Sequence, residues 1–317
     1  MSLYDSILSA ELAVRKHLRF TPTEHSLFLS KKTGAEVYLK LENYQVTGSF
    51  KARGAINKLS QLSDDEKACG VITASSGNHG LGVASGAKKL GIHAIVYVPE
   101  YADRSKVQAI ELEGADVKPL GDDCVITESA ARKNAEQSGK VYISPYNDLD
   151  VIAGQGTIGV ELVQQIKQLD AVFVSVGGGG LISGIGAYLK EASPQTKVIA
   201  CSPSQSPAMH ECMKAKKIID VACYPTLSDA TAGGVEEGAV TLNLCRSHID
   251  ESILVDEAEI KEAMLFTINQ HHMLIEGAAG VAIAAFLKEQ ESYKGKRVAI
   301  LICGGNIGIE KLRQVIS

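Results

Sequence analysis

The chain has 317 residues, 45% hydrophobic and 22% charged, which is enough for one large or two ordinary domains with a full core. Its formal net charge of −5 provides no basic surface for nucleic acid or an anionic membrane. No apolar run has the length of a transmembrane helix and residues 1–5 lack a signal-peptide pattern, so we expect a cytoplasmic protein. Its seven scattered cysteines lack C-x-x-C spacing and are expected to be reduced thiols, not a disulfide frame or a zinc site.

In chain order, predicted strands and helices alternate. The first half reads as helix 5–19, strand 36–41, a helix beginning near residue 51, strand 70–73, a helix through residue 89, strand 93–99, helix 104–113, strand 116–118 and helix 127–137. The second half reads as helix 152–168, strand 171–176, helix 181–190, strand 197–201, helices 256–272 and 278–290, and strand 298–302. This alternation predicts an α/β fold with open, mostly parallel twisted sheets covered by helices on both faces. We expect two closely joined domains, a large one of residues 1–65 and 148–317 and a small mobile one of residues 66–147.

The stretch around Lys51 is the first candidate for chemistry. Thr47 or Ser49 is predicted to cap a helix in which Phe50 and Lys51 form the first turn. An ammonium group is disfavoured there by the helix dipole, so the pKa of an amine held beside Phe50 would be lowered and the amine could act as a nucleophile. The alternative is a solvated lysine that happens to lie near a helix cap.

Four consecutive glycines, Gly177 to Gly180, follow an apolar strand and open a helix with Leu181. Backbone N–H groups at such a turn bind phosphate, whereas the alternative is a tight turn with close helix–strand packing. A Walker loop is excluded because no Gly-Lys-Thr/Ser follows. A dinucleotide site, and with it an oxidoreductase, is disfavoured because Ser202-Pro203 follows the next strand where an acidic residue is required.

Three further segments lie where strands are predicted to end. Ser75-Ser76-Gly77-Asn78-His79-Gly80 offers hydroxyls, an amide and loop N–H groups for a carboxylate, or is a helix cap and turn. Cys303 ends the last strand before Gly304-Gly305-Asn306, at the same predicted edge. Glu276 is a helix-start carboxylate or faces the site, and His79 is expected to be structural.

In this order, the segments resemble one family over essentially the whole chain: the pyridoxal-phosphate enzymes of the tryptophan-synthase-β type (fold type II), in the serine/threonine dehydratase and serine racemase branch. Besides the loops, the resemblance rests on residues 41–43, 48–55 and 151–157, which read LEN, GSFKARGA and VIAGQGT. It implies pyridoxal 5'-phosphate as the cofactor, a small amino acid as the substrate and a homodimer as the assembly.

The resemblance also implies roles for individual residues. Lys51 would hold the cofactor covalently, with Phe50 and Glu276 beside it. Asn78 would bind the ring hydroxyl, Cys303 would face the pyridine nitrogen, and the phosphate would lie on Gly177, Gly178, Gly179, Gly180 and Leu181. The substrate carboxylate would lie on the loop of Ser75, Ser76, Gly77, Asn78 and His79, with Gly234 as a further substrate contact.

The implied reaction is dehydration and deamination of a small β-hydroxy-α-amino acid, such as L-threonine or L-serine, to a 2-oxo acid and ammonia. A thiol at the pyridine nitrogen does not stabilise a protonated ring, which favours prompt loss of the β-hydroxyl. The rival is a serine racemase, because racemases of this family place a serine at the position of Ser76 as the second base.

Departures from the family pattern limit what is carried over. Ser202 and Ala208 stand where some members bind a stabilising metal through carboxylates, so no metal is expected. Ala232-Gly233-Gly234 stands in for a loop that usually reads Ala-Asp-Gly, which could widen the site or change the substrate. A dehydratase for hydroxyaspartate, phenylserine or a similar amino acid therefore stays an alternative.

Overall fold

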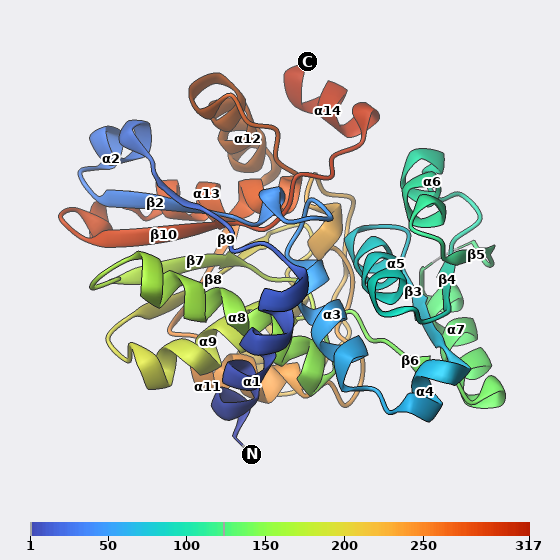
Figure 1. Cartoon of the computed structure of the whole chain (residues 1–317). Coiled ribbons are helices and arrows are strands. Elements are labelled where there is room, and N and C mark those ends of the chain that lie inside the picture. The colour runs from blue at the N-terminus through green and yellow to red at the C-terminus, as the bar shows by residue number, and fades with distance from the viewer. Residues whose placement is uncertain (1, 123) are drawn as a thin grey trace.

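The computed structural model describes residues 2–122 and 124–317 and contains two separate sheets (Figure 1). The larger has the strand order β1-β2-β10-β7-β8-β9, in which only the β1–β2 pair is antiparallel. Its strands are β1 (Thr23–His25), β2 (Glu36–Leu41), β7 (Ala171–Ser175), β8 (Lys197–Pro203), β9 (Glu251–Val255) and β10 (Arg297–Ile302). The smaller sheet has the order β5-β4-β3-β6 and is parallel throughout. Its strands are β3 (Val71–Ala74), β4 (Ala94–Val98), β5 (Asp116–Pro119) and β6 (Val141–Tyr142). The predicted α/β architecture is confirmed.

Helices cover both faces of the larger sheet, as the apolar strands require (Figure 1). One face carries α8 (Leu149–Gln165) and α9 (Gly180–Ala192), with α1 (Leu3–His17) packed on them. The other carries α13 (Gly277–Lys288), with α12 (Glu257–His271) packed on it. The core between them is apolar and continuous: every residue of β7 is buried, and Phe173 packs edge-on against Phe286 and Tyr293.

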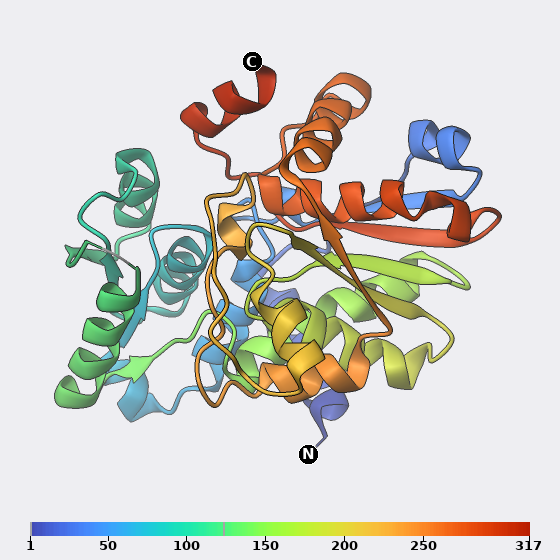
Figure 2. The same ribbon diagram turned by 180° about the vertical axis from the view of Figure 1, so that it is seen from behind.

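The smaller sheet has its own helical cover. Helix α7 (Cys124–Ser138) packs against β3, β4 and β6, while α5 (Asn78–Leu90) contacts β3 and β4, and α6 (Arg104–Leu112) packs on α5. Helix α3 (Lys51–Gln61) lies between the two halves because it packs on both α5 and α8. Figure 2 shows the long connection between α10 (Ala208–Ala215) and α11 (Thr241–His248) running between the two sheets.

Several short or exposed helices and strands were not predicted from the sequence. The predicted strands and the helices of the alternating regions are confirmed within a few residues, but α2 (Leu27–Thr33), α4 (Asp64–Cys69), α14 (Ile309–Ile316) and the helices of the connection after β8 were missed. The edge strands β1, β6 and β9 were missed as well. All three are partly exposed and lack the continuous apolar pattern of the inner strands. None of the helices in residues 2–122 and 124–317 is long and apolar enough to cross a membrane.

The topology gathers several chain segments at one place. Residues that follow β3, β7 and β10, at the carboxyl ends of parallel strands, meet the beginnings of α3, α5, α9 and α13. This is where open α/β sheets bind ligands, and helix N-termini add a positive potential there.

Candidate active site

A cavity of about 420 Å³ lies between the two sheets at these strand ends, within the size range of ligand pockets. Every residue that the sequence put forward for the site lines this one cavity. They are Phe50, Lys51, Ser75, Ser76, Gly77, Asn78, His79, Gly177, Gly178, Gly179, Gly180, Leu181, Gly234, Glu276 and Cys303.

Lys51 is the first residue of α3, and its side chain reaches into the cavity. Its Nζ donates a hydrogen bond of 2.8 Å to the carbonyl oxygen of Pro145 and lies 5.3 Å from the centre of the Phe50 ring. Burial lowers the pKa of Lys51 to about 8, although nearby Glu276 and Cys303 act in the opposite direction. A substantial fraction of this amine is therefore neutral, and nucleophilic, at mildly alkaline pH.

The predicted helix cap is wrong. Phe50 is the N-cap of α3 and no side chain caps this helix; the Oγ of Ser49 is buried without a hydrogen-bond partner among the described residues. Thr47 Oγ1 donates to the nearby carbonyl of Ser49, at 3.5 Å, and not to an N–H of α3. The loop is instead held by backbone hydrogen bonds to the end of β10, from Phe50 N to Cys303 O and from Gly305 N to Gly48 O, both 3.0 Å.

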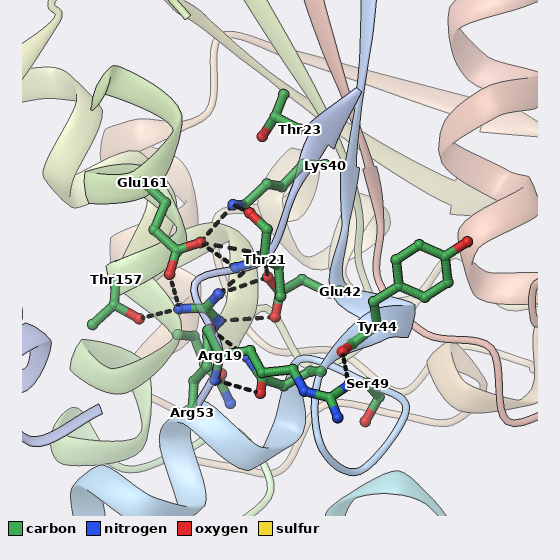
Figure 3. A network of polar contacts seen from close by, with 12 residues as sticks. Arg19, Thr21, Thr23, Lys40, Glu42, Tyr44, Ser49, Arg53, Thr157 and Glu161 are labelled. Carbon is green, nitrogen blue, oxygen red and sulfur yellow. Dashed lines mark hydrogen bonds and ion pairs between the residues drawn. The ribbon is translucent and has the colours of Figure 1, made fainter. Parts of the chain in front are cut away.

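A buried ionic network fixes the helix that carries Lys51 (Figure 3). Arg53 is the third residue of α3. It donates 2.8 Å hydrogen bonds to both carboxylate oxygens of Glu42 and to Glu161, as well as a 3.1 Å bond to Thr157. Lys40 donates to the other oxygen of Glu161. Arg53, Lys40, Glu42 and Glu161 are fully buried, so two positive and two negative charges compensate one another. The network joins β2, α3 and α8 into one rigid support.

The backbone of the glycine loop can bind a phosphate, and the loop has no room for side chains. Helix α9 begins at Gly180 with no side-chain cap, so its first N–H groups are left for a ligand. A Cβ at Gly178 would overlap the ring of Tyr146, and one at Gly180 would come within 3.0 Å of the same residue. Gly179 has φ of 85°, which favours glycine.

The Ser75 loop opens α5, with the side chains of Ser75 and Ser76 half-buried at the cavity wall. Asn78 is the first helical residue, and its Nδ2 contacts the two carboxylate oxygens of Glu276 at 3.1 and 2.8 Å. His79 is hydrogen-bonded to the carbonyl oxygen of Ile143 at 3.0 Å, and burial lowers its pKa to about 3. It is neutral at physiological pH, as a structural histidine would be.

Cys303 and Glu276 form the buried wall opposite the loops. The Sγ of Cys303 lies 3.7 Å from Glu276 Oε1. Burial raises the pKa of the Glu276 carboxyl and raises the pKa of the Cys303 thiol well above its ordinary value. Glu276 is also the N-cap of α13, but its side chain makes no capping bond and faces the cavity. Of the two readings of Glu276 left open by the sequence, the structure favours the one in which it faces the site.

Sequence reasoning assigned no role to several polar cavity residues, among them Tyr146, Asn306, Lys106 and Asp229. Tyr146 covers the glycine loop, and Asn306 contacts Asn78. Lys106 and Asp229 lie 3.6 Å apart (Nζ to Oδ2) at the cavity wall. Only Asn306 had a sequence signal, as the residue that ends the Cys303-Gly304-Gly305-Asn306 segment; the others come from segments without a motif.

Comparison with known proteins places the chain in a family. Residues 14–304 match the family described as pyridoxal-phosphate dependent enzyme. An L-threonine ammonia-lyase of Thermotoga maritima is 40% identical over 100% of this chain and 79% of its own length. The processed form of threonine deaminase isoform 2 from Solanum lycopersicum has a TM-score of 0.94 and 34% identity, over 99% of this chain and 92% of its own. Serine racemase from Dictyostelium discoideum has a TM-score of 0.90 and 35% identity, over 98% and 99%.

The cavity fits the cofactor of this family. The uncapped start of α9 with its side-chain-free glycines suits a phosphate, and an amine with a depressed pKa suits an aldehyde. Tyr146 occupies the space that a Cβ at Gly178 or Gly180 would need, so both positions require glycine and the loop presents only backbone to a ligand. The chain is therefore a member of the pyridoxal-phosphate dependent enzymes, and its cofactor is pyridoxal 5'-phosphate.

Proposed function

We propose that the protein is an ammonia-lyase that dehydrates and deaminates a small β-hydroxy-α-amino acid, such as L-threonine or L-serine, to a 2-oxo acid and ammonia. The observation that carries the proposal is that Lys51, the glycine loop and the Ser75–His79 loop line one cavity. The similarity to a threonine ammonia-lyase over the whole chain supports the same reaction.

In this proposal each loop has one task. Lys51 holds the cofactor, and Gly177 to Leu181 hold its phosphate. The loop from Ser75 to His79 binds the substrate carboxylate through N–H groups and hydroxyls, because a carboxylate needs donors and the two serines and the start of α5 supply them. Phe50 packs beside the cofactor, and Gly234 borders the substrate.

Pyridoxal phosphate, when bound, withdraws electrons from the substrate Cα and so acidifies its proton. Once the substrate amine has taken its place on the cofactor, the freed amine of Lys51 would take that proton, because its lowered pKa leaves it neutral at mildly alkaline pH. The Lys51 ammonium would then return the proton to the β-hydroxyl, which would leave as water. Cys303 keeps its own proton as a neutral thiol, since burial raises its pKa. With the pyridine nitrogen beside it, a neutral thiol would not favour a protonated ring as a carboxylate would. Negative charge at the substrate Cα would then be less delocalised, which would favour loss of the β-hydroxyl.

The test is release of 2-oxo acid across a panel of β-hydroxy amino acids of both hands. We expect turnover of L-threonine or L-serine that is lost in Lys51→Ala, and cofactor fixed on Lys51 after borohydride reduction of the wild type. The absence of both 2-oxo acid release and fixed cofactor would refute the proposal.

Racemisation is the second candidate function, because Ser76 lines the same cavity as Lys51 and carries a hydroxyl that could protonate the opposite face of Cα. Ser76→Ala is expected to reduce D-serine formation and α-proton exchange more than pyruvate release. If Ser76→Ala left racemisation intact, Ser76 would not be the second base.

A larger substrate is favoured by one feature of the cavity wall. A Cβ at Gly233 or Gly234 would meet no atom within 4 Å, so this loop leaves open space beside the site. Hydroxyaspartate and phenylserine therefore belong in the substrate panel. Preference for either over threonine would change the substrate but leave the reaction class as proposed.

We also propose that the protein is a cytoplasmic homodimer with a large domain of residues 1–65 and 148–317 and a small, mobile domain of residues 66–147. The separate smaller sheet, β3 to β6, lies wholly within the small domain and supports this division. Light scattering coupled to gel filtration tests the dimer, and hydrogen exchange with and without substrate tests the mobility of residues 66–147.

A further inference from the structure

A chain of side-chain hydrogen bonds crosses the cavity wall and ends at Glu276. It begins at a backbone carbonyl: Asn306 Nδ2 donates to Thr47 O at 2.8 Å. The same nitrogen donates to Asn78 Oδ1 at 2.7 Å, and Asn78 Nδ2 donates to Glu276 at 2.8 Å (Oε2) and 3.1 Å (Oε1). Four segments that are far apart in sequence are joined in this way.

The donor-to-acceptor direction of these hydrogen bonds is set by the backbone carbonyl of Thr47. The Thr47 carbonyl can only accept, so it fixes the amide nitrogen of Asn306 toward itself and toward Asn78. Asn78 must then present its oxygen to Asn306, which leaves its NH₂ group facing Glu276 and the cavity. A carboxamide can otherwise be turned by 180° at no steric cost, because its oxygen and nitrogen are nearly the same size.

Two glycines make room for this chain of hydrogen bonds. A Cβ at Gly48 would overlap the side-chain oxygen of Asn306, and one at Gly304 would lie 2.6 Å from Glu276 Oε1. Gly48 also has φ of 72°, a conformation that favours glycine. The backbone bridge between Ser49 and Gly304 fixes both glycines beside each other. The close approach of these two loops is therefore what places the three side chains in one line.

We propose that Asn306 is a positioning residue that, with Glu276, holds the Asn78 amide with its N–H side toward the cofactor. In this arrangement a single N–H of Asn78 is shared between the two carboxylate oxygens of Glu276, and the second N–H donates to an oxygen of the bound ring. The inference rests on the proposed role of Asn78 as the partner of the cofactor's ring hydroxyl. Reversal of the amide would place a carbonyl oxygen against that oxygen and exchange an attraction for a repulsion.

The experiment compares Asn306→Asp with Asn306→Ala in the cofactor-loaded and cofactor-free protein. Aspartate has the size of asparagine but no N–H donor, so it accepts from Asn78 and turns the Asn78 amide round; alanine only removes the contact. We expect Asn306→Asp to weaken cofactor binding roughly tenfold more than Asn306→Ala, about the effect of one hydrogen bond to a charged group. The absorption band of the bound cofactor should shift in Asn306→Asp and change little in Asn306→Ala.

A packing role for Asn306 predicts the reverse order, because aspartate fills the space and alanine leaves a void. Asn43→Asp is the matched control for added charge: Asn43 packs against Gly305, beside the same turn, but does not line the cavity. It should leave the cofactor's absorption and affinity near those of the wild type. A shift as large in Asn43→Asp as in Asn306→Asp would attribute the effect to charge and overturn the inference.

A double variant tests the direction of the chain without relying on activity. In Asn306→Asp combined with Glu276→Gln, the new glutamine NH₂ can donate to the reversed Asn78 carbonyl, and the net charge equals that of the wild type. We expect the cofactor-free double variant to melt at a higher temperature than Asn306→Asp alone, with a positive coupling in the double-mutant cycle. Additive losses in that cycle would contradict the inference.

Asn78→Ala separates the two levels of the proposal. An unchanged cofactor spectrum in Asn78→Ala would remove the proposed role of Asn78 and the inference with it. A changed spectrum in Asn78→Ala, together with an Asn306→Asp variant milder than Asn306→Ala, would overturn the role of Asn306 alone.

Discussion

Lys51 owes its reactivity to two features of its surroundings. Its amine is removed from water, which disfavours the charged form, and it lies near Glu276, which favours that form. Burial is the larger effect, so the pKa falls from 10.5 to about 8. At a pH near 8, Lys51 is therefore present both as the charged ammonium and as the neutral amine, and the neutral amine can act as a nucleophile.

This balance predicts the pH dependence of cofactor capture by the cofactor-free protein. Only the neutral amine attacks an aldehyde, so the capture rate should rise about tenfold per pH unit below pH 8 and level off above it. The appearance of the visible absorption band after rapid mixing measures this rate. A midpoint near 10.5 would show that the amine is solvated.

Glu276→Gln should move the same midpoint below that of the wild type. The carboxylate favours the ammonium form of Lys51, and a neutral amide cannot. Lys294→Met, which removes an exposed partner of Glu291, is the control and should leave the midpoint unchanged. A midpoint that moves upward in Glu276→Gln would contradict the electrostatic coupling.

At the scale of secondary-structure elements, the buried charges around Arg53 bind α3 to its neighbours (Figure 3). Helix α3 has no side-chain cap, yet its first turn is bonded to η1 (Glu42–Tyr44) and to α8 through the guanidinium group of Arg53. At the same crossing a Cβ at Gly154 would come within 2.5 Å of the Arg53 carbonyl oxygen, so α3 and α8 pack backbone to backbone. The position of Lys51 is thus set by contacts on the far side of its helix.

Glu161→Gln is expected to lower the free energy of unfolding by about 3 to 5 kcal/mol, because Arg53 and Lys40 would keep buried charge with one carboxylate fewer. Urea denaturation of the cofactor-free protein measures the loss. Glu310→Gln breaks an exposed pair with Arg313 and should cost less than about 0.5 kcal/mol. Equal effects of the two substitutions would rule out a structural role for the network.

At the scale of the whole molecule, ion pairs connect the smaller sheet and its helices to the long connection seen in Figure 2. Lys106 of α6 lies 3.6 Å from Asp229, which also lies 3.3 Å from Lys311 of α14. Arg132 of α7 pairs with Glu236 at 2.6 Å, and the backbone N–H of Glu236 donates to the hydroxyl of Tyr146. Ion pairs to α6 and α7 of the smaller sheet and to α14 therefore fix the position of the connection that borders the cavity.

Lys106→Met should raise the KM for the amino-acid substrate roughly two- to fivefold with a smaller effect on kcat, because one partly exposed ion pair across the cavity is lost. Salt screens such pairs, so the wild-type KM should rise with ionic strength and that of the variant should rise less. Steady-state kinetics at two salt concentrations measures both. A KM that responds equally to salt in the two proteins would contradict this role for Lys106.

The fold class and the segments of the site can be predicted from the amino-acid sequence alone. Inner parallel strands are buried on both faces and so read as apolar runs, and the loops at their ends carry glycine, serine and asparagine for reasons that are local. Lys51, Ser76, Asn78, the four glycines and Cys303 could therefore be named from the chain alone; their individual roles stay predictions.

The interactions among those segments depend on contacts between residues far apart in the sequence, so they are visible only in the folded protein. The capping of α3 by Thr47 or Ser49 was predicted wrongly because the competing interaction, a backbone bridge to Gly304, comes from a segment some 250 residues away. Lys106, Asp229 and Tyr146 enter the site through contacts between distant elements, and no local pattern marks such residues. The direction of the Asn78 amide is of the same kind: it is set by a single carbonyl oxygen at Thr47, which no side-chain pattern in the sequence records.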